Sequence, residues 1–315
     1  MTTQPDMVKS AVTFPEEGFA QYETETMTQL MWRQFTRHRM AVIGLIVVAV
    51  LALASIVGPM VSPYDPYRSN FSERYQPPSL QHPMGTDDLG RDMLTRILQG
   101  GRISLSIGVM AMTLALIIGT LVGAIAGFYG GKIDNLLMRF TDLMLSLPQL
   151  FVLILMTILL RSINIPLLQA GGGVFAIVFV IALLSWMTVA RLVRGSFLAL
   201  REKEFVEAAR ALGISNTRIM FRHILPNAMS PVIVAGTLRV ASSIITESGL
   251  SFLGFGVQPP TPTWGNMLKN AQDEMMRGNL WMAIFPGLMI FITVIAINYI
   301  GDGLRDALDP YKMRQ

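Results

Sequence analysis

The stretch MAVIGLIVVAVLALASIVGPMV, residues 40–61, decides the class of fold, because it contains no charged side chain. A helix needs about 20 mainly apolar residues to cross the roughly 30 Å hydrocarbon core of a bilayer. The composition of the whole chain agrees, since 52% of its 315 residues are hydrophobic and only 15% are charged. Soluble domains carry about 25% charged residues. The sequence therefore predicts a membrane protein.

Five more apolar runs follow along the chain, one of them interrupted by Arg239 and another by Pro148. Pro148 predicts a kink or a slight tilt in the run that contains it. The six predicted spans are Met40–Val61, Ile103–Tyr129, Leu143–Leu160, Gly173–Ala190, Ala228–Thr246 and Leu280–Ile300. The predicted fold class is an all-α membrane protein with six transmembrane helices.

The distribution of positive charge predicts the orientation of these spans. With both termini in the cytoplasm, the cytoplasmic segments contain twice as many lysines and arginines as the outer ones. Residues 191–227 alone contain seven of the 25. Positive residues concentrate in cytoplasmic loops, so we expect both termini inside. No cleavable signal peptide is visible before the first run, and residues 29–39 predict a basic, aromatic helix at the membrane surface.

Several classes of chemistry have no support in the sequence. The chain has no cysteine, so it has no disulfide framework or thiolate metal site, and its three histidines are far apart. The glycine-rich segment AGFYGGK at 126–132 lacks the first glycine and the final Ser/Thr of a phosphate-binding loop. No catalytic constellation is present. Gly119, Gly123 and Gly127 instead predict close packing of one helix on another. We expect a non-catalytic protein without metal.

The loop REKEFVEAARALGISNTRIMFRHILP, residues 201–226, is too long for a simple turn between two spans. Four apolar residues at helical spacing predict one face of a short helix, namely Phe205, Ala208, Ala209 and Leu212. Gly213 suits the left-handed residue that ends a helix, and Ser215 or Asn216 can begin the next helix. We expect that second helix to stop at Pro226. The apolar face either inserts into a groove on another protein or packs under the bundle, and the residues alone favour neither.

This loop resembles the EAA loop of permease subunits in binding-protein-dependent ABC importers. Glu207, Ala208, Ala209, Gly213 and the later Leu225–Pro226 match that motif. Three more blocks resemble the second-type permease of the oligopeptide, dipeptide and nickel subfamily: HPMGTDDLGRDMLTRILQGGRISL (82–105), ESGLSFLGFGVQPPTPTWGNML (247–268) and NYIGDGLRDALDP (298–310). The resemblance covers most of residues 29–312.

The resemblance implies a type I ABC importer permease in the cytoplasmic membrane of a prokaryote. Its partners would be a second permease, one or two ATPase subunits, an extracytoplasmic substrate-binding protein and membrane lipid, with no nucleic acid. ATP and Mg would bind the ATPases, so this chain would hold no cofactor. Glu207 would face basic or amide groups of the ATPase, Ala208 and Ala209 would permit close approach, and Gly213 would set the turn. Phe205 and Leu212 complete the ATPase-coupling set.

The expected organisation has four segments. Residues 1–28 form a disordered cytoplasmic tail, and 29–101 contain the surface helix, the first span and an outer loop. Residues 102–302 form the permease domain with its EAA loop at about 202–226, and 303–315 form a cytoplasmic tail that either braces the EAA loop or is solvated. In the outer loop we expect Thr86 or Asp87 to cap a helix. Residues 247–268 predict a re-entrant or surface loop that contributes to a gate.

Arg239 is the remaining candidate, since a charge inside a span suggests function. It either lines the translocation path or extends to the outer interface near Glu247. We therefore interpret the chain as a permease for peptides, with nickel chelates, glutathione or another small solute as the alternative cargo. A stand-alone secondary transporter or channel would need charged sites in several spans and usually an internal repeat, and an intramembrane enzyme would need catalytic groups. The sequence shows neither.

Overall fold

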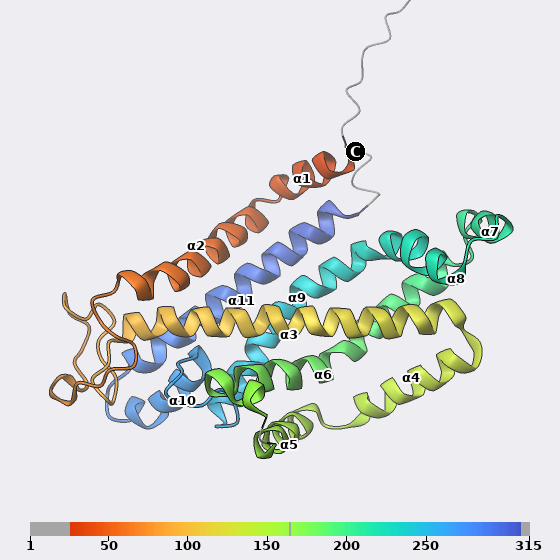
Figure 1. Cartoon of the computed structure of the whole chain (residues 1–315). Helices are drawn as coiled ribbons and strands as arrows, with labels where there is room; N and C mark the ends of the chain where they lie inside the picture. Colours follow the sequence, from red (N-terminus) through yellow and green to blue (C-terminus); the bar gives the residue numbers. More distant parts are fainter. Residues whose placement is uncertain (1–25, 164, 310–315) are drawn as a thin grey trace, which may run out of the picture.

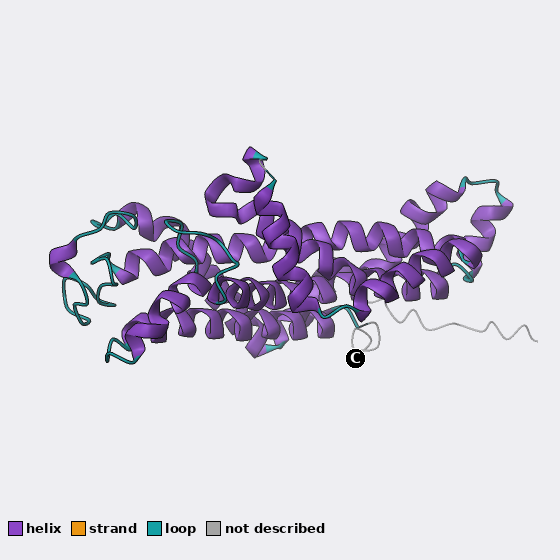
Figure 2. Ribbon diagram, turned by 90° about the horizontal axis from the view of Figure 1, so that it is seen from below, coloured by secondary structure: helices purple, strands orange, loops and turns teal. Residues whose placement is uncertain are grey.

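The computed structural model describes residues 26–163 and 165–309, so most of the predicted N-terminal tail and the end of the C-terminal tail lie outside it. The described residues form helices joined by loops, the longest of them residues 62–92, and contain no β-strand (Figure 2). Its helices are α1 (Met27–Arg37), α2 (Arg39–Val61), α3 (Met93–Tyr129), α4 (Gly131–Ser146), α5 (Gln149–Ser162), α6 (Pro166–Leu200), α7 (Glu204–Ala211), α8 (Asn216–Arg218), α9 (Leu225–Phe252), α10 (Trp264–Met275) and α11 (Trp281–Ala307), with a 3-10 turn η1 (Phe71–Glu73) and a π-helix η2 (Ile219–Ile224).

Five helical segments are long and apolar enough to cross a membrane: α2, α3, α6, the continuous Asn216–Phe252 segment, and α11. They lie side by side with α7 at one end and residues 62–92 at the other (Figure 1). We call these the elbow end and the loop end. The end of α1 and the start of α2 pack beside the last turns of α11, where Phe35, Ala41 and Ala307 form a small buried cluster. The predicted multi-span helical architecture is therefore confirmed.

The third predicted span, Leu143–Leu160, is not one helix. The chain breaks at Leu147 and Pro148, and α4 and α5 meet there at 93°. A proline has no backbone N–H and disfavours helical backbone in the residue before it, but the bend is far larger than the kink or slight tilt that the sequence predicted. The bent pair still takes the chain from the elbow end, where α3 stops, to the start of α6 (Figure 1). Counted as one span, it is the sixth.

The glycine stripe on α3 packs as predicted. A Cβ atom on Gly119, Gly123 or Gly127 would lie 2.4–2.8 Å from a backbone oxygen of α6. The two helices therefore approach too closely for any side chain at these positions. Trp186 and Ala190 of α6 fill the space beside the stripe and belong to the central hydrophobic core. This contact between α3 and α6 forms the middle of the bundle.

The loop end differs from its prediction in one detail. Neither Thr86 nor Asp87 caps α3. Asp92 is the cap, and its carboxylate accepts the backbone N–H of Thr95 at 2.8 Å. Asp87 instead accepts from the side chain of Arg91 at 2.7 Å. The two acidic residues are close in sequence, and the turn between them determines which one reaches the helix terminus.

Candidate functional site

The elbow that follows α6 has an exposed apolar stripe. Lys203 begins α7, and Phe205, Ala208 and Leu212 point away from the bundle, with Leu212 80% exposed. An exposed apolar stripe on a short helix outside the membrane core marks a surface that another protein can cover. Three of the four residues of the predicted apolar face, Phe205, Ala208 and Leu212, are therefore exposed.

The same helix is anchored to the bundle on its neighbouring face. Val206 is 0% exposed and Ala209 is 4% exposed, and both pack in a core cluster with Phe128, Phe197 and the π-helix. Ala209 was expected on the partner-facing stripe, and the structure places it against its own bundle. Val206 was missed, because helical spacing identifies a face but does not say which side of it the bundle covers. Glu207 is exposed and makes no ion pair in the described part of the chain.

The turn after α7 has the predicted geometry. Gly213 has φ +74°, the left-handed conformation that glycine adopts without strain. Ser215 begins α8, which passes through the π-helix η2 directly into α9. The sequence predicted that the helix stops at Pro226, and this prediction is wrong. Pro226 lies inside the continuous helical segment Asn216–Phe252, two residues after the π-helix η2. The elbow is therefore continuous with a membrane-crossing helix.

Ion pairs hold α4 beside the elbow end of α6. Arg194 donates to the Asp134 carboxylate, with Nη2 and Oδ2 2.6 Å apart, and Arg191 pairs with Asp142. Arg201 adds a hydrogen bond to the Gly127 carbonyl at 3.2 Å. These partners are 49 to 74 residues apart in sequence. No local spacing pattern could have identified them.

The outward face of α9 has several small polar residues among its apolar ones. Its exposed or half-exposed residues include Asn227, Ser230, Ser242 and Thr246, beside the apolar Ile233 and Ile245. Near the elbow end, this face lines a cavity of about 580 Å³ together with Asp302 and Arg305 of α11 and Leu192 of α6. Arg239 is half-buried on α9 beyond this cavity, and no hydrogen bond or ion pair involves it within residues 26–163 and 165–309. Arg239 thus has no counter-charge among the residues that the structure describes.

A buried carboxylate near the other end of α9 was not among the sequence candidates. Glu247 is 0% exposed and accepts hydrogen bonds from Ser251 at 2.7 Å, Ser104 at 3.3 Å and Ser248 at 3.5 Å. Two of these serines stand one and four residues after Glu247. Such spacing on a helix was the available signal. Ser104 also accepts the backbone N–H of Trp264, so Glu247 connects α9 to α3 and the start of α10.

The segment predicted as a re-entrant or surface loop is half helical, because α9 continues to Phe252 and α10 begins at Trp264, and the loop itself is residues 253–263. The short loop between them is held from two sides. The Arg161 side chain at the end of α5 donates to the Phe255 carbonyl at 2.8 Å, and the Gln258 N–H donates to the Gly172 carbonyl at 2.9 Å. The described residues contain no group of three or more side chains that could hold a metal ion.

Family models cover most of the chain. The family described as binding-protein-dependent transport system inner membrane component matches residues 119–314. The N-terminal TM domain of oligopeptide transport permease C matches residues 26–78. The chain belongs to this permease family. The resemblance to permease subunits of binding-protein-dependent importers is thereby confirmed, and the permease is a multi-pass membrane protein.

Curated relatives match over nearly their whole length. The permease is 39% identical over 288 residues to the dipeptide transport system permease protein DppC of Bacillus subtilis, a match that covers 91% of this chain and 87% of the relative. It is 40% identical to the oligopeptide transport system permease protein OppC of the same organism, covering 90% and 88%. It is 42% identical to the glutathione transport system permease protein GsiD of Escherichia coli, covering 89% of each.

A solved structure shares the fold at much lower identity. The inward-facing MetNI methionine ABC transporter contains a chain that superposes with a TM-score of 0.53 and is 19% identical. The match covers 67% of this chain and 95% of that one. The permease therefore contains the helical core found in an ABC transporter, with additional residues outside it.

Proposed function

We propose that the permease is one of two transmembrane subunits of an ABC importer for peptides, and that ATP hydrolysis in separate subunits drives it through α7. The observation that carries this proposal is the position of the stripe Phe205, Ala208 and Leu212. These side chains are exposed on a helix whose other face, Val206 and Ala209, is buried in the bundle. A partner bound to the stripe can push on the core through the anchor.

The route of coupling follows from continuity of the chain. The 37-residue segment Asn216–Phe252 is one helical rod, so a displacement of α7 reaches the whole length of α9. The π-helix Ile219–Ile224 lies at the base of that rod, and π-helical turns are common where function needs a local irregularity. The elbow end would be cytoplasmic, as the excess of positive charge on residues 191–227 indicates. Both termini would then lie inside a cytoplasmic membrane.

In this proposal the substrate passes along the outward face of α9, between this subunit and a second permease. An extracytoplasmic binding protein delivers it, and opening alternates between the two sides of the membrane. Peptides are the favoured cargo because the relatives named above include dipeptide and oligopeptide permeases at 39–40% identity. Glutathione, itself a small peptide, is the alternative, since the glutathione permease is equally similar. Nickel chelates remain a further possibility for this architecture.

Co-purification tests the assembly. The tagged full-length chain, expressed with its partner subunits and extracted in mild detergent, should retain a second permease and ATPase subunits. The double variant Phe205→Asp, Leu212→Asp should lose the ATPases and keep the second permease, because the charges occupy the exposed stripe only. Ala211→Asp adds one negative charge at an exposed position of α7 outside the stripe and serves as the control. A wild-type chain that transports alone would contradict the proposal.

Arg239 is proposed to line the path and to meet a carboxylate of the substrate or of the second permease. Its lack of a partner among the described residues supports this role, since an unpaired charge inside a span is costly. Arg239→Leu should reduce uptake at unchanged membrane abundance, and Arg239→Lys should keep part of it. Wild-type uptake by Arg239→Leu would exclude Arg239 from the path.

A further inference from the structure

Arg102 is a second unpaired cation, and it lies on a different face of the bundle. It is exposed on α3, and its guanidinium makes no hydrogen bond or ion pair anywhere in the described ranges. The one contact that involves Arg102 uses its backbone carbonyl, which accepts the Ser106 hydroxyl at 2.6 Å. A charged side chain on an apolar helix needs a counter-charge or water. The bundle itself supplies neither an acidic neighbour nor a polar pocket.

The depth of Arg102 can be read from the packing of α3 against α2. The Ser62 and Thr95 hydroxyls are 2.6 Å apart at the loop end, where both helices meet the connecting segment. One residue before Arg102, a Cβ on Gly101 would lie 2.5 Å from the Ser55 hydroxyl. Val61, the last residue of α2, stands six residues after Ser55, which is about 9 Å along the helix axis. Arg102 lies at the level of Ser55, so its backbone is inside the apolar layer, and its long side chain can extend to the polar boundary.

Two apolar grooves run along α3 from Arg102. The first has a volume of about 320 Å³ between α2 and α3, and its lining includes Arg102, Ile56 and Leu105. The second, of about 480 Å³, lies between α3 and the start of α6 and is lined by Ile117, Phe175 and Phe179 among others. Val109 and Met110 line both grooves, so the two grooves adjoin at these residues, and we call the adjoining pair the α3 track.

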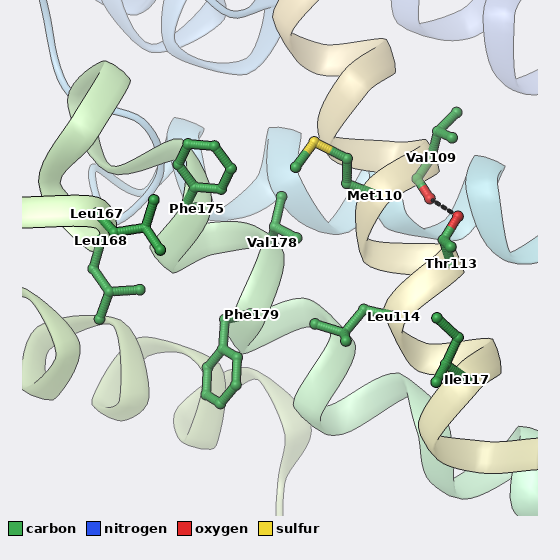
Figure 3. Close-up of a pocket in the computed structure, with 10 residues that line it drawn as sticks. All are labelled: Val109, Met110, Thr113, Leu114, Ile117, Leu167, Leu168, Phe175, Val178 and Phe179. Atoms are coloured by element: carbon green, nitrogen blue, oxygen red, sulfur yellow. Dashed lines mark hydrogen bonds between the residues drawn. The ribbon is translucent and has the colours of Figure 1, made fainter. Parts of the chain in front are cut away.

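The second groove offers a hydrocarbon surface (Figure 3). Its one hydroxyl belongs to Thr113, which donates a hydrogen bond to the Val109 carbonyl of its own helix at 2.8 Å. Every other side chain in that lining is aliphatic, aromatic or methionine. The stretch from Arg102 to Ile117 spans about 22 Å of helix. This exceeds the roughly 15 Å thickness of one leaflet's hydrocarbon, so the track is long enough for an acyl chain.

The outward faces of α3 and α9 differ in chemistry. On α3 the large exposed residues after Arg102 are apolar and include Val109, Met110, Ile117, Leu121 and Ile125, whereas the exposed hydroxyls of Ser106 and Thr113 bond to carbonyls of their own helix. The α9 face combines serine, threonine and asparagine with Ile233 and Ile245 and opens beside α6 and α11, whereas the α3 face opens beside α2 and α6. A mainly apolar face on a membrane helix is suited to lipid, and a face with more small and polar residues to a partner or an aqueous path.

We infer that the α3 track is a binding site for one phospholipid. The lipid phosphate pairs with Arg102, and an acyl chain lies along Val109, Met110 and Ile117. Charge complementarity selects this occupant, because a single cation stands at the end of an apolar track at the boundary of the membrane. A free phosphate ion would use Arg102 and leave the track uncovered. A protein helix would have to bring its own acidic residue to the same depth. The inference holds for either orientation of the permease.

Native mass spectrometry of the full-length permease tests this site. The protein is purified in detergent and titrated with palmitoyl-oleoyl phosphatidylglycerol. Arg102→Gln should weaken retention of the first bound lipid at least tenfold, since a charge-assisted contact is worth about 1.5–3 kcal/mol. Met110→Trp should weaken it by filling the track while the charge stays. Arg102→Lys should retain binding. Arg68→Gln removes an exposed positive charge from the loop outside the track and should leave binding unchanged.

Three results would overturn the assignment. Equal lipid retention by wild type, Arg102→Gln and Met110→Trp would mean that lipid binds elsewhere. Displacement of the lipid by millimolar inorganic phosphate would identify a free-anion site. The chain has no native cysteine, so Met110→Cys can be labelled at one position with a photoreactive probe in native membranes. A cross-link to another protein chain, in place of lipid, would identify that face as a protein interface.

Discussion

The two ends of the rod Asn216–Phe252 are built in opposite ways. At the elbow end, Gly213 has open space around it and Leu212 is exposed. At the loop end, Glu247 is fully buried with three serine hydroxyls, and a Cβ on Gly265 would lie 2.6 Å from the Ser248 backbone. Regions with few buried contacts open most readily. The turn that joins α7 to the rod is therefore open where a partner would act, although Ile219 and Ile224 in the first turns of the rod are buried, and the loop end is closely packed around Glu247.

The loop end should be the more sensitive of the two to loss of a side chain. Glu247→Ala leaves the hydroxyls of Ser104, Ser248 and Ser251 without their acceptor and creates a cavity. Each buried unsatisfied group costs about 1–3 kcal/mol, so we expect the largest loss of stability in this series. The measurement is the half-life of the folded protein in detergent at a fixed elevated temperature, because membrane proteins often unfold irreversibly.

Two controls separate burial from charge at this position. Glu247→Gln keeps one carbonyl acceptor and similar volume, so it should lose much less stability than Glu247→Ala. Glu204→Ala removes an exposed carboxylate at the elbow end and should change the half-life little. Similar half-lives for Glu247→Ala and Glu204→Ala would remove the difference between the two ends.

The elbow end should be more sensitive in function than in stability. Gly213→Val forces a β-branched residue into φ +74°, which costs about 1–3 kcal/mol of local strain. Nothing lies within 4 Å of the new Cβ, so the bundle itself should stay intact. We expect near-normal membrane abundance with uptake strongly reduced, measured in cells that carry all the partner subunits.

Asparagine tolerates the left-handed conformation better than other residues with a side chain. Gly213→Asn should therefore retain most of the uptake that Gly213→Val loses. Equal uptake by the two variants at equal abundance would show that the turn geometry does not position α7.

The smallest expected effect on stability concerns Asp88, an acidic residue at the loop end. Burial raises the pKa of Asp88, repulsion from Asp87 adds to the increase, and one carboxylate oxygen has no hydrogen-bond partner. A raised folded-state pKa means that ionisation of Asp88 opposes folding. The stability that protonated Asp88 contributes below its unfolded-state pKa is therefore lost as pH rises through its folded-state pKa. Asp88→Asn should slightly increase thermal stability at pH 7, and the gain should shrink towards pH 4. A gain independent of pH would contradict ionisation as its cause.

The parts of the fold that depend on local pattern could be predicted from the sequence. Apolar runs identified five membrane-crossing helices, the small residues at 119, 123 and 127 identified the α3–α6 contact, and Gly213 identified the end of α7. Pro148 marked the break in the third span, but the 93° angle depends on how α4 and α5 pack against the bundle. Pro226 was misread because the helix continues past it from the π-helix η2, an irregular turn that the sequence pattern does not reveal.

The site was predictable only in part, for a similar reason. Spacing placed Ala209 on one face with Phe205, whereas the bundle covers Ala209 and leaves Phe205 exposed. Glu247 resembles any polar residue at the end of a span until Ser104, 143 residues away, is seen to donate to it. Long-range contacts of this kind are set by tertiary packing and leave no periodic trace in the sequence.

Site-specific cross-linking tests the central claim, that α7 is where the ATPase acts on this permease. In the naturally cysteine-free chain, Leu212→Cys is labelled with a photoreactive maleimide in membranes that contain the partner subunits. Arg277→Cys, exposed near the loop end, receives the same label as the control. We predict a cross-link to the ATPase from Leu212→Cys alone. An ATPase that co-purifies but cross-links only from Arg277→Cys, or from neither position, would contradict the account.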